Sequence, residues 1–141
     1  MVDEVESNEG AEIEARFHSG AEQVVRDGYT LLHGKAGDMA LIPVIDGGFT
    51  FRPGRHAYQA LQKQADFQWI PYNGTVLKAK GTKTVIAHII LPVKDDSEAH
   101  SIVTSGKTSC DSQGNCSLSF SYHGKSYNYV FKYDKDGFVL E

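Results

Sequence analysis

The stretch TVIAHIILPV, residues 84–93, is the longest apolar run in the chain. A membrane-spanning helix needs about 18 apolar residues, so this run has the length of a strand instead. Apolar residues occupy both odd and even positions, which is typical of a strand that is buried on both faces. The run therefore predicts a central strand, in which His88 is a core histidine hydrogen-bonded to the backbone.

Segments with strand-like alternation surround this run. Residues 117–123 (SLSFSYH) alternate polar and apolar side chains, and residues 126–133 (SYNYVFKY) carry aromatic side chains at every second position. We expect these apolar positions to form the core side of a sheet, with an open binding face as the alternative. Asp27-Gly28 and Asn73-Gly74 lie between such segments, and both dipeptides are typical of two-residue hairpin turns. Around Asp27-Gly28 a helix over residues 19–34 is the alternative, because Ser19 and Glu22 have the spacing of a capping box.

The spacing of strands and turns predicts a mainly β protein. The antiparallel meander is expected to form a sandwich, a partly closed barrel or one curved sheet. One short helix is expected near residues 55–66, where the apolar residues fall on one helical stripe. Residues 1–11 are acidic and without periodicity, so we expect a flexible terminus, followed by a single β-rich domain over residues 12–141.

Two other stretches lead to further expectations. Pro43 lacks a backbone N–H, which would place the strand around it at a sheet edge or a bulge. Residues 94–99 (KDDSEA) have the composition of a solvated loop, from which residues 100–109 (HSIVTSGKTS) lead to the cysteines.

Composition and motifs argue against several functions. The 14 Lys and Arg residues are outnumbered by 18 Asp and Glu residues, giving a net charge of −4. A nucleic-acid partner is not expected, because proteins that bind phosphate backbones normally have a basic face. We also expect no membrane partner, and no metal or other cofactor, since no catalytic, phosphate-binding or metal-binding motif is present.

Cys110 and Cys116 are the only cysteines. A disulfide between them is favoured over a zinc site, which needs two further ligands, and over a redox pair, which normally has Cys-x-x-Cys spacing. Two reduced thiols in a cytosolic protein are the alternative. Because disulfides persist in oxidising compartments, we expect a periplasmic or secreted protein whose signal peptide has been removed.

The loop between the cysteines is short and polar. Closing it with a disulfide lowers the entropy of the unfolded chain, which is worth roughly 2–2.5 kcal/mol of stability. One explanation is therefore that the disulfide only stabilises the fold. The other explanation is that the loop must stay rigid while exposed, since a pre-organised loop loses less entropy on binding. The residues then expected to contact a partner are Thr108, Ser109, Asp111, Ser112, Gln113 and Asn115.

These observations favour a protein-binding module that is not an enzyme. The most concrete hypothesis is an inhibitor or immunity protein that inserts the loop into the active site of a secreted enzyme, such as a cell-wall hydrolase. Many such hydrolases are basic, which would steer an acidic partner toward them. The alternatives are a lipocalin-like carrier lined by Phe67, Trp69 and tyrosines, or an enzyme that uses His88 or His123 with a carboxylate. The oligomeric state stays open.

Overall fold

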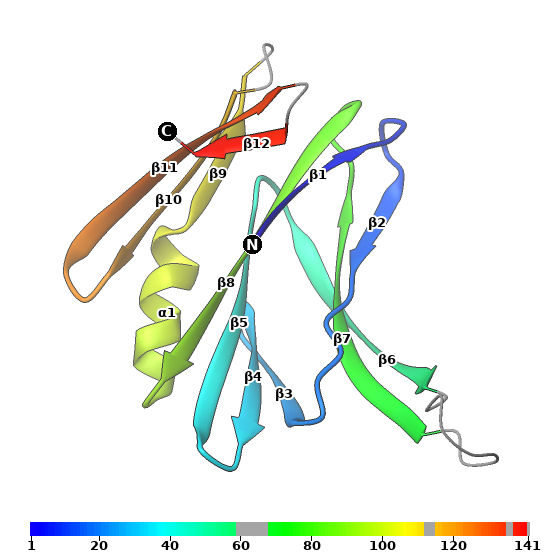
Figure 1. The fold of residues 1–141 in the computed structure, drawn as a ribbon, viewed down its shortest axis with the longest axis vertical. Helices are drawn as coiled ribbons and strands as arrows, with labels where there is room; N and C mark the ends of the chain where they lie inside the picture. The colour runs from blue at the N-terminus through cyan, green and yellow to red at the C-terminus, as the bar shows by residue number, and fades with distance from the viewer. Residues whose placement is uncertain (59–67, 112–114, 135–136, 141) are drawn as a thin grey trace.

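The computed structural model describes residues 1–58, 68–111, 115–134 and 137–140. These ranges contain twelve strands and one helix, so the chain is mainly β as predicted (Figure 1). The strands are β1 (Val2–Glu6), β2 (Glu12–Ala15), β3 (Glu22–Arg26), β4 (Tyr29–Gly34), β5 (Gly37–Ile45), β6 (Phe49–Tyr58), β7 (Gln68–Lys78), β8 (Lys83–Val93), β9 (Lys107–Cys110), β10 (Asn115–Tyr122), β11 (Lys125–Asp134) and β12 (Gly137–Leu140). The helix is α1 (Asp96–Ser105).

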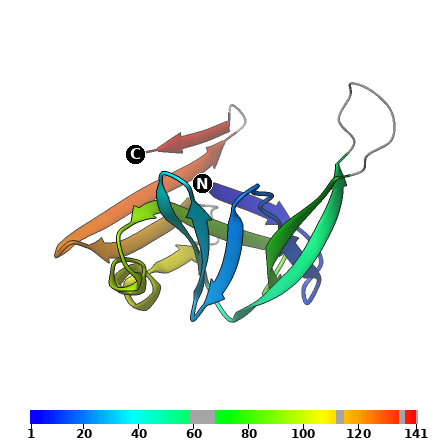
Figure 2. The same cartoon turned by 90° about the horizontal axis from the view of Figure 1, so that it is seen from below.

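The strands form three antiparallel sheets. A central sheet has the order β1-β8-β5-β4-β3, an outer sheet the order β2-β7-β6, and a hairpin sheet the order β12-β11-β10-β9. Strand β8, which contains the whole of the long apolar run, lies between β1 and β5, as its two apolar faces predicted. Figure 2 shows the hairpin sheet and the outer sheet on opposite sides of the molecule.

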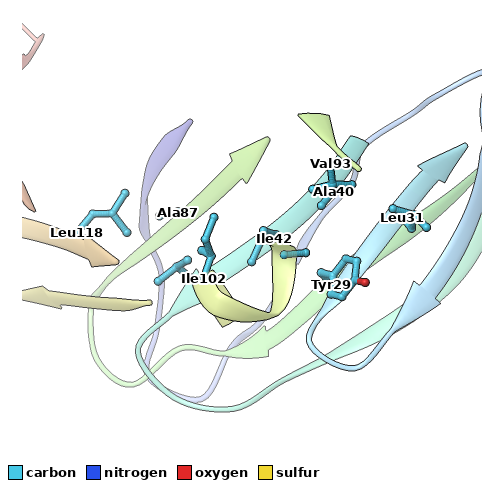
Figure 3. Packing of buried hydrophobic residues seen from close by; sticks show 10 residues of the cluster. Tyr29, Leu31, Ala40, Ile42, Ala87, Val93, Ile102 and Leu118 are labelled. Carbon is cyan, nitrogen blue, oxygen red and sulfur yellow. The ribbon is translucent and has the colours of Figure 1, made fainter. Parts of the chain in front are cut away.

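One face of the central sheet packs against α1 and the hairpin sheet (Figure 3). Ile42 of β5 and Ala87 of β8 cluster with Ile102 of α1, and all three are fully buried. Burying a side chain such as that of Ile102 contributes about 1.5–3 kcal/mol. Leu118 of β10 joins the same cluster, so α1 and the hairpin sheet are anchored to one core.

The aromatic face of β10 and β11 borders this core. Phe120, Tyr122, Tyr129 and Phe131 are partly buried against it, which confirms that these positions lie on the core side. The rings of Phe120 and Tyr127 stack with their centroids 5.1 Å apart. Cross-strand aromatic pairs of this kind stabilise a sheet beyond the area they bury.

The helix of the described residues is Asp96–Ser105, and Arg55–Tyr58, where a helix was expected to begin, are not part of a helix. Arg55–Tyr58 instead continue β6, which pairs with β7 over ten residue pairs, and residues 59–67 lie outside the described residues. For Arg55–Tyr58 the helix prediction was wrong, because the ladder with β7 supplies backbone hydrogen bonds that local periodicity does not reveal.

The helix replaces the loop expected at residues 94–99. Asp95 caps it, accepting a hydrogen bond from the backbone N–H of Ser97 at 2.9 Å, and Glu98 accepts one from the backbone N–H of Lys94 at 2.9 Å. Asp95 and Glu98 stand at the spacing of a capping box, a signal of a helix start. Ala99 and Ile102, spaced by three residues, supply the buried stripe, so the loop prediction was wrong.

The structure also differs at the amino terminus. Residues 1–11 were expected to be flexible, yet Val2–Glu6 form β1 along the outer edge of β8. Two features explain the pairing. The side chain of Val2 packs against the core cluster, and Lys83 on β8 donates a hydrogen bond to the carboxylate of Glu4 at 2.8 Å.

The Asn73-Gly74 dipeptide lies within β7 and forms no turn, contrary to prediction. Neither residue has the positive φ that a two-residue hairpin turn of this type requires. A side chain at Gly74 would overlap the carboxylate of Glu14 on the neighbouring strand. Glycine is thus needed here for close approach of two chain segments and not for a turn.

The Asp27-Gly28 hairpin is confirmed. It joins β3 to β4, with Gly28 at a φ of 84°. The connection between β10 and β11 is made by His123 and Gly124, whose φ values of 49° and 71° are those of a tight hairpin turn. The turn expected at residues 134–137 includes residues 135–136, which lie outside the described residues.

Pro43 lies in an interior strand, β5, rather than at an edge. His88 of β8 lies directly opposite Pro43, and its backbone N–H and C=O both form hydrogen bonds of 2.9 Å with Met1, on the side away from β5. The two residues therefore form a pair without mutual backbone hydrogen bonds, and the nitrogen of Pro43 faces β4. The ladder between β4 and β5 reaches only Leu41. Pro43 lies beyond it, so the missing N–H leaves no hydrogen bond unmade.

Candidate functional site: the disulfide-closed hairpin

Strands β9 and β10 form a hairpin whose end carries the two cysteines. Cys110 and Cys116 lie directly opposite each other, with their Cα atoms 4.1 Å apart, and a disulfide joins them. The predicted covalent bond is therefore present, at the last pair of the regular ladder. It links two strands that already pair through their backbones.

The segment beyond the disulfide is closed by hydrogen bonds between Asp111 and Asn115. The Asp111 N–H donates to the Asn115 carbonyl at 2.9 Å. The Asn115 backbone N–H and side-chain amide donate to the Asp111 carboxylate at 2.9 and 2.7 Å. Ser112 and Gln113, two of the predicted contact residues, lie outside the described residues. Both ends of the segment that contains them are nevertheless fixed in position.

The two remaining predicted contact residues face opposite sides of the hairpin. Ser109 is exposed, and its hydroxyl lies 2.8 Å from that of Ser117 on the neighbouring strand. Thr108 is 8% exposed and pairs with Leu118, which places its side chain on the core side. Ser109 is thus accessible to a partner, whereas Thr108 is not.

A small cavity adjoins strand β9 of the hairpin. Its volume is about 120 Å³, and Thr108, Ser109 and Cys110 form its hairpin side. The remainder of its lining comes from the central sheet and its connections, namely Asp46, Lys80, Lys83, Thr84 and Val85. Typical pockets for drug-sized ligands span about 300–1,000 Å³, so this cavity suits only a very small group or a few waters.

The charges at this cavity are already paired. The ammonium group of Lys80 lies 3.2 Å from the carboxylate of Asp46, and that of Lys83 lies 2.8 Å from Glu4 and 3.6 Å from Glu6. The hydrogen bond to Glu4 raises the pKa of the Lys83 side chain. Sequence reasoning missed these lysines because nothing in the KAKGTK stretch, residues 78–83, links it to the cysteines.

Two larger surface cavities carry charged residues in their walls. One, of about 450 Å³, is lined by Glu6, Ser7, Asn8, Thr82 and Lys83. The other, of about 350 Å³, lies at the start of α1 and includes Arg26 and Asp96. Neither provides the apolar interior of a lipocalin-like carrier. Phe67, expected to line that interior, is outside the described residues, as is the side chain of Trp69.

His88 is buried, as predicted, with 1% of its surface exposed. Its imidazole does not bond to the backbone as expected: Nε2 lies 3.3 Å from the hydroxyl of Thr75, and Nδ1 has no hydrogen-bond partner among the described residues. Burial, aided by the positive charge of the Met1 amino group, lowers the pKa of His88 to about 4. A neutral, inaccessible imidazole cannot exchange protons with a substrate bound at the surface.

His123 is the other histidine considered for catalysis. Its Nε2 atom lies 3.7 Å from the carboxylate of Glu98, beyond the roughly 2.6–3.2 Å at which a catalytic base is held by its partner. Its ring contacts that of Tyr122 with centroids 4.0 Å apart. The pair is a surface contact between the β10–β11 turn and α1.

Comparisons with models of protein families, with curated proteins and with solved structures gave no match. In the described part of the chain, the helix is too short to cross a bilayer. Across the same residues, no group of three or more His, Cys, Asp or Glu side chains could hold a metal ion. The function is therefore inferred from the geometry of the hairpin.

Proposed function

We propose that this protein is a binding module for another protein and that the disulfide-closed end of the β9–β10 hairpin is its contact element. The observation that carries the proposal is the double closure of this end. A covalent bond at Cys110 and Cys116 is followed at once by the hydrogen bonds between Asp111 and Asn115.

The position of the closure supports a role in binding. Cys110 and Asp111 are exposed, and the core cluster contacts the hairpin farther from its closed end, at Leu118, Phe120 and Tyr122 of β10. Fixing an exposed segment adds little to packing of the core. It does lower the entropy lost when the segment is ordered against a partner, which favours affinity.

The partner that best fits these properties is a secreted enzyme, such as a cell-wall hydrolase, with the hairpin inserted into its active site. Small polar residues at the hairpin end suit a narrow polar cleft. The net charge of −4 favours encounter with a basic enzyme. The disulfide is typical of an oxidising compartment, so we propose a periplasmic or secreted location.

The test uses the full oxidised chain to capture proteins from secreted and periplasmic fractions of the source cells. The retained enzyme is purified, and its affinity and activity are measured with the wild type, Ser112→Trp and Ser126→Trp. Ser126 is the matched control, because it is exposed at the opposite end of β10 and β11.

We expect the wild type to inhibit the enzyme. The S112W variant should bind at least about tenfold more weakly, a loss of about 1.4 kcal/mol, while S126W binds normally. Equal binding by S112W and the wild type would remove the hairpin end from the interface. Failure to retain any enzyme in a saturable manner would refute the inhibitor proposal.

A further inference from the structure

Two exposed histidines meet on the face of the outer sheet that points away from the core. His18 follows β2 and forms a bridge to Tyr72 of β7, while His56 lies on β6. Strands β2 and β6 flank β7 on its two sides, so residues 38 positions apart converge (Figure 1). The centroids of the two imidazole rings are 4.9 Å apart.

The ring of Tyr72 holds this arrangement from below. Tyr72 is 9% exposed, and its ring lies so close to Gly54 that a side chain there would overlap it. His18 packs against the same ring at 5.1 Å, and the guanidinium of Arg16 lies 5.2 Å from its centroid. Because Tyr72 is fixed, the two histidines are presented from a rigid surface.

The spacing of the rings suits shared coordination of one metal ion. With a Zn–N distance of about 2.0–2.1 Å, a zinc ion lies about 3.2 Å from the centroid of each imidazole ring that binds it. If the angle at the metal between the two rings is about 90–110°, the two centroids are about 4.5–5.2 Å apart. The observed 4.9 Å falls within this interval. Both side chains are exposed, so their rings can turn their nitrogens toward a common ion without disturbing the core.

The surrounding charges permit a cation. The guanidinium of Arg16, which lies over the ring of Tyr72, is paired with the carboxylate of Glu14 at 2.7 Å. Imidazole is a preferred ligand of zinc, copper and nickel, whereas calcium and magnesium prefer oxygen ligands.

We propose that His18 and His56 form a surface site for a divalent cation of the zinc type, with water completing the coordination. The site requires only these two side chains and the strand order that brings them together. The site does not depend on the proposed partner-binding hairpin, which belongs to a different sheet. It can therefore be tested without a protein partner.

The test is titration of the full chain with Zn²⁺ alone, followed by calorimetry and by the imidazole signals in NMR spectra. The wild type is compared with His18→Gln, His56→Gln and the control His100→Gln, which removes an exposed histidine on α1. We expect one ion per chain, with the signals of His18 and His56 shifting together.

Each of the two site variants should bind Zn²⁺ at least about tenfold more weakly, since loss even of groups that only orient metal ligands costs 10–100-fold. H100Q should bind as the wild type does. No binding by the wild type at about 1 mM Zn²⁺ would overturn the proposal. Undiminished Zn²⁺ binding by either site variant would also overturn it. So would NMR shifts in the wild type that are confined to other histidines, and this measurement does not depend on whether the variants fold.

Discussion

The Nε2 atom of His88 lies 3.3 Å from the hydroxyl oxygen of Thr75, and both side chains are almost completely buried. The contact joins β8 of the central sheet to β7 of the outer sheet. The ring of Phe17 packs against the same imidazole with centroids 4.6 Å apart. A titratable group is thus placed in the layer between the two sheets, where water cannot solvate its charge.

This placement predicts that acid weakens the fold through His88. Burial lowers the pKa of His88 to about 4 from a usual 6.5, so the unfolded chain binds the proton more readily. No effect is expected above about pH 6.5, and as the pH falls from there to about 4 the wild type should lose up to about 3 kcal/mol from this group. Urea denaturation at several pH values measures the loss.

The matched variant for this prediction is His88→Gln, which keeps a hydrogen-bonding side chain but cannot titrate. Carboxylates also affect stability in acid, so the comparison concerns the pH dependence and not the absolute stability. Between about pH 7 and pH 4, the variant should lose less stability than the wild type. Parallel curves for the two proteins would show that His88 is not the responsible group.

The disulfide predicts sensitivity to reductant. Opening the bond between Cys110 and Cys116 frees a short loop in the unfolded chain, which should lower the free energy of unfolding by about 2 kcal/mol. Denaturation with and without reductant measures this, and the exposed Cys110→Ser variant should be insensitive to reductant. If the wild type responds no more than the variant, the bond contributes nothing to stability.

Sequence patterns located features that depend on nearby residues. The apolar run of β8 revealed a central strand because Val85–His88 are buried on both faces, although Ile90 of the same run is 47% exposed. The Asp27-Gly28 turn formed because Gly28 adopts a positive φ. The cysteine pair was predicted correctly because six positions of separation suit directly opposed residues of a hairpin.

Features that depend on distant residues were missed. Asn73-Gly74 carries a strong turn signal, but β7 continues through it because β2 and β6 pair on both of its sides. The His18–His56 contact arises only from the strand order of the outer sheet. The cavity beside the hairpin likewise joins Lys80 to Thr108, which no local pattern relates.

Close packing over Gly54 predicts a large effect of a small substitution. Gly54→Ala would place a methyl group into the ring of Tyr72, and such overpacking typically costs 1–3 kcal/mol. Gly48→Ala is the control, because nothing lies within 4 Å of the added carbon. Thermal denaturation should show a lower melting temperature for G54A and little change for G48A. Equal melting temperatures would mean that the ring moves aside without cost.

The helix should depend on Ile102. This side chain is fully buried between α1 and the central sheet, and Ile→Ala substitutions at such sites cost about 2–5 kcal/mol. Ile90→Ala makes the same chemical change at a residue that is 47% exposed, and should cost far less. Urea denaturation of both variants compares the two sites. A similar loss in each would contradict the assignment of Ile102 to the core.

The hairpin end should owe part of its rigidity to the carboxylate of Asp111. Asp111→Ala removes the acceptor of the Asn115 backbone N–H and side-chain amide but leaves the disulfide intact. Hydrogen exchange at the Asn115 amide should therefore accelerate, while amides of the core strands keep their protection, because the opening is local. Asp3→Ala, at an exposed position of β1, is a control that should leave Asn115 unaffected. Unchanged exchange at Asn115 in D111A would mean that the disulfide holds the hairpin end without the carboxylate, and the pre-organisation proposed for binding would then rest on the covalent bond.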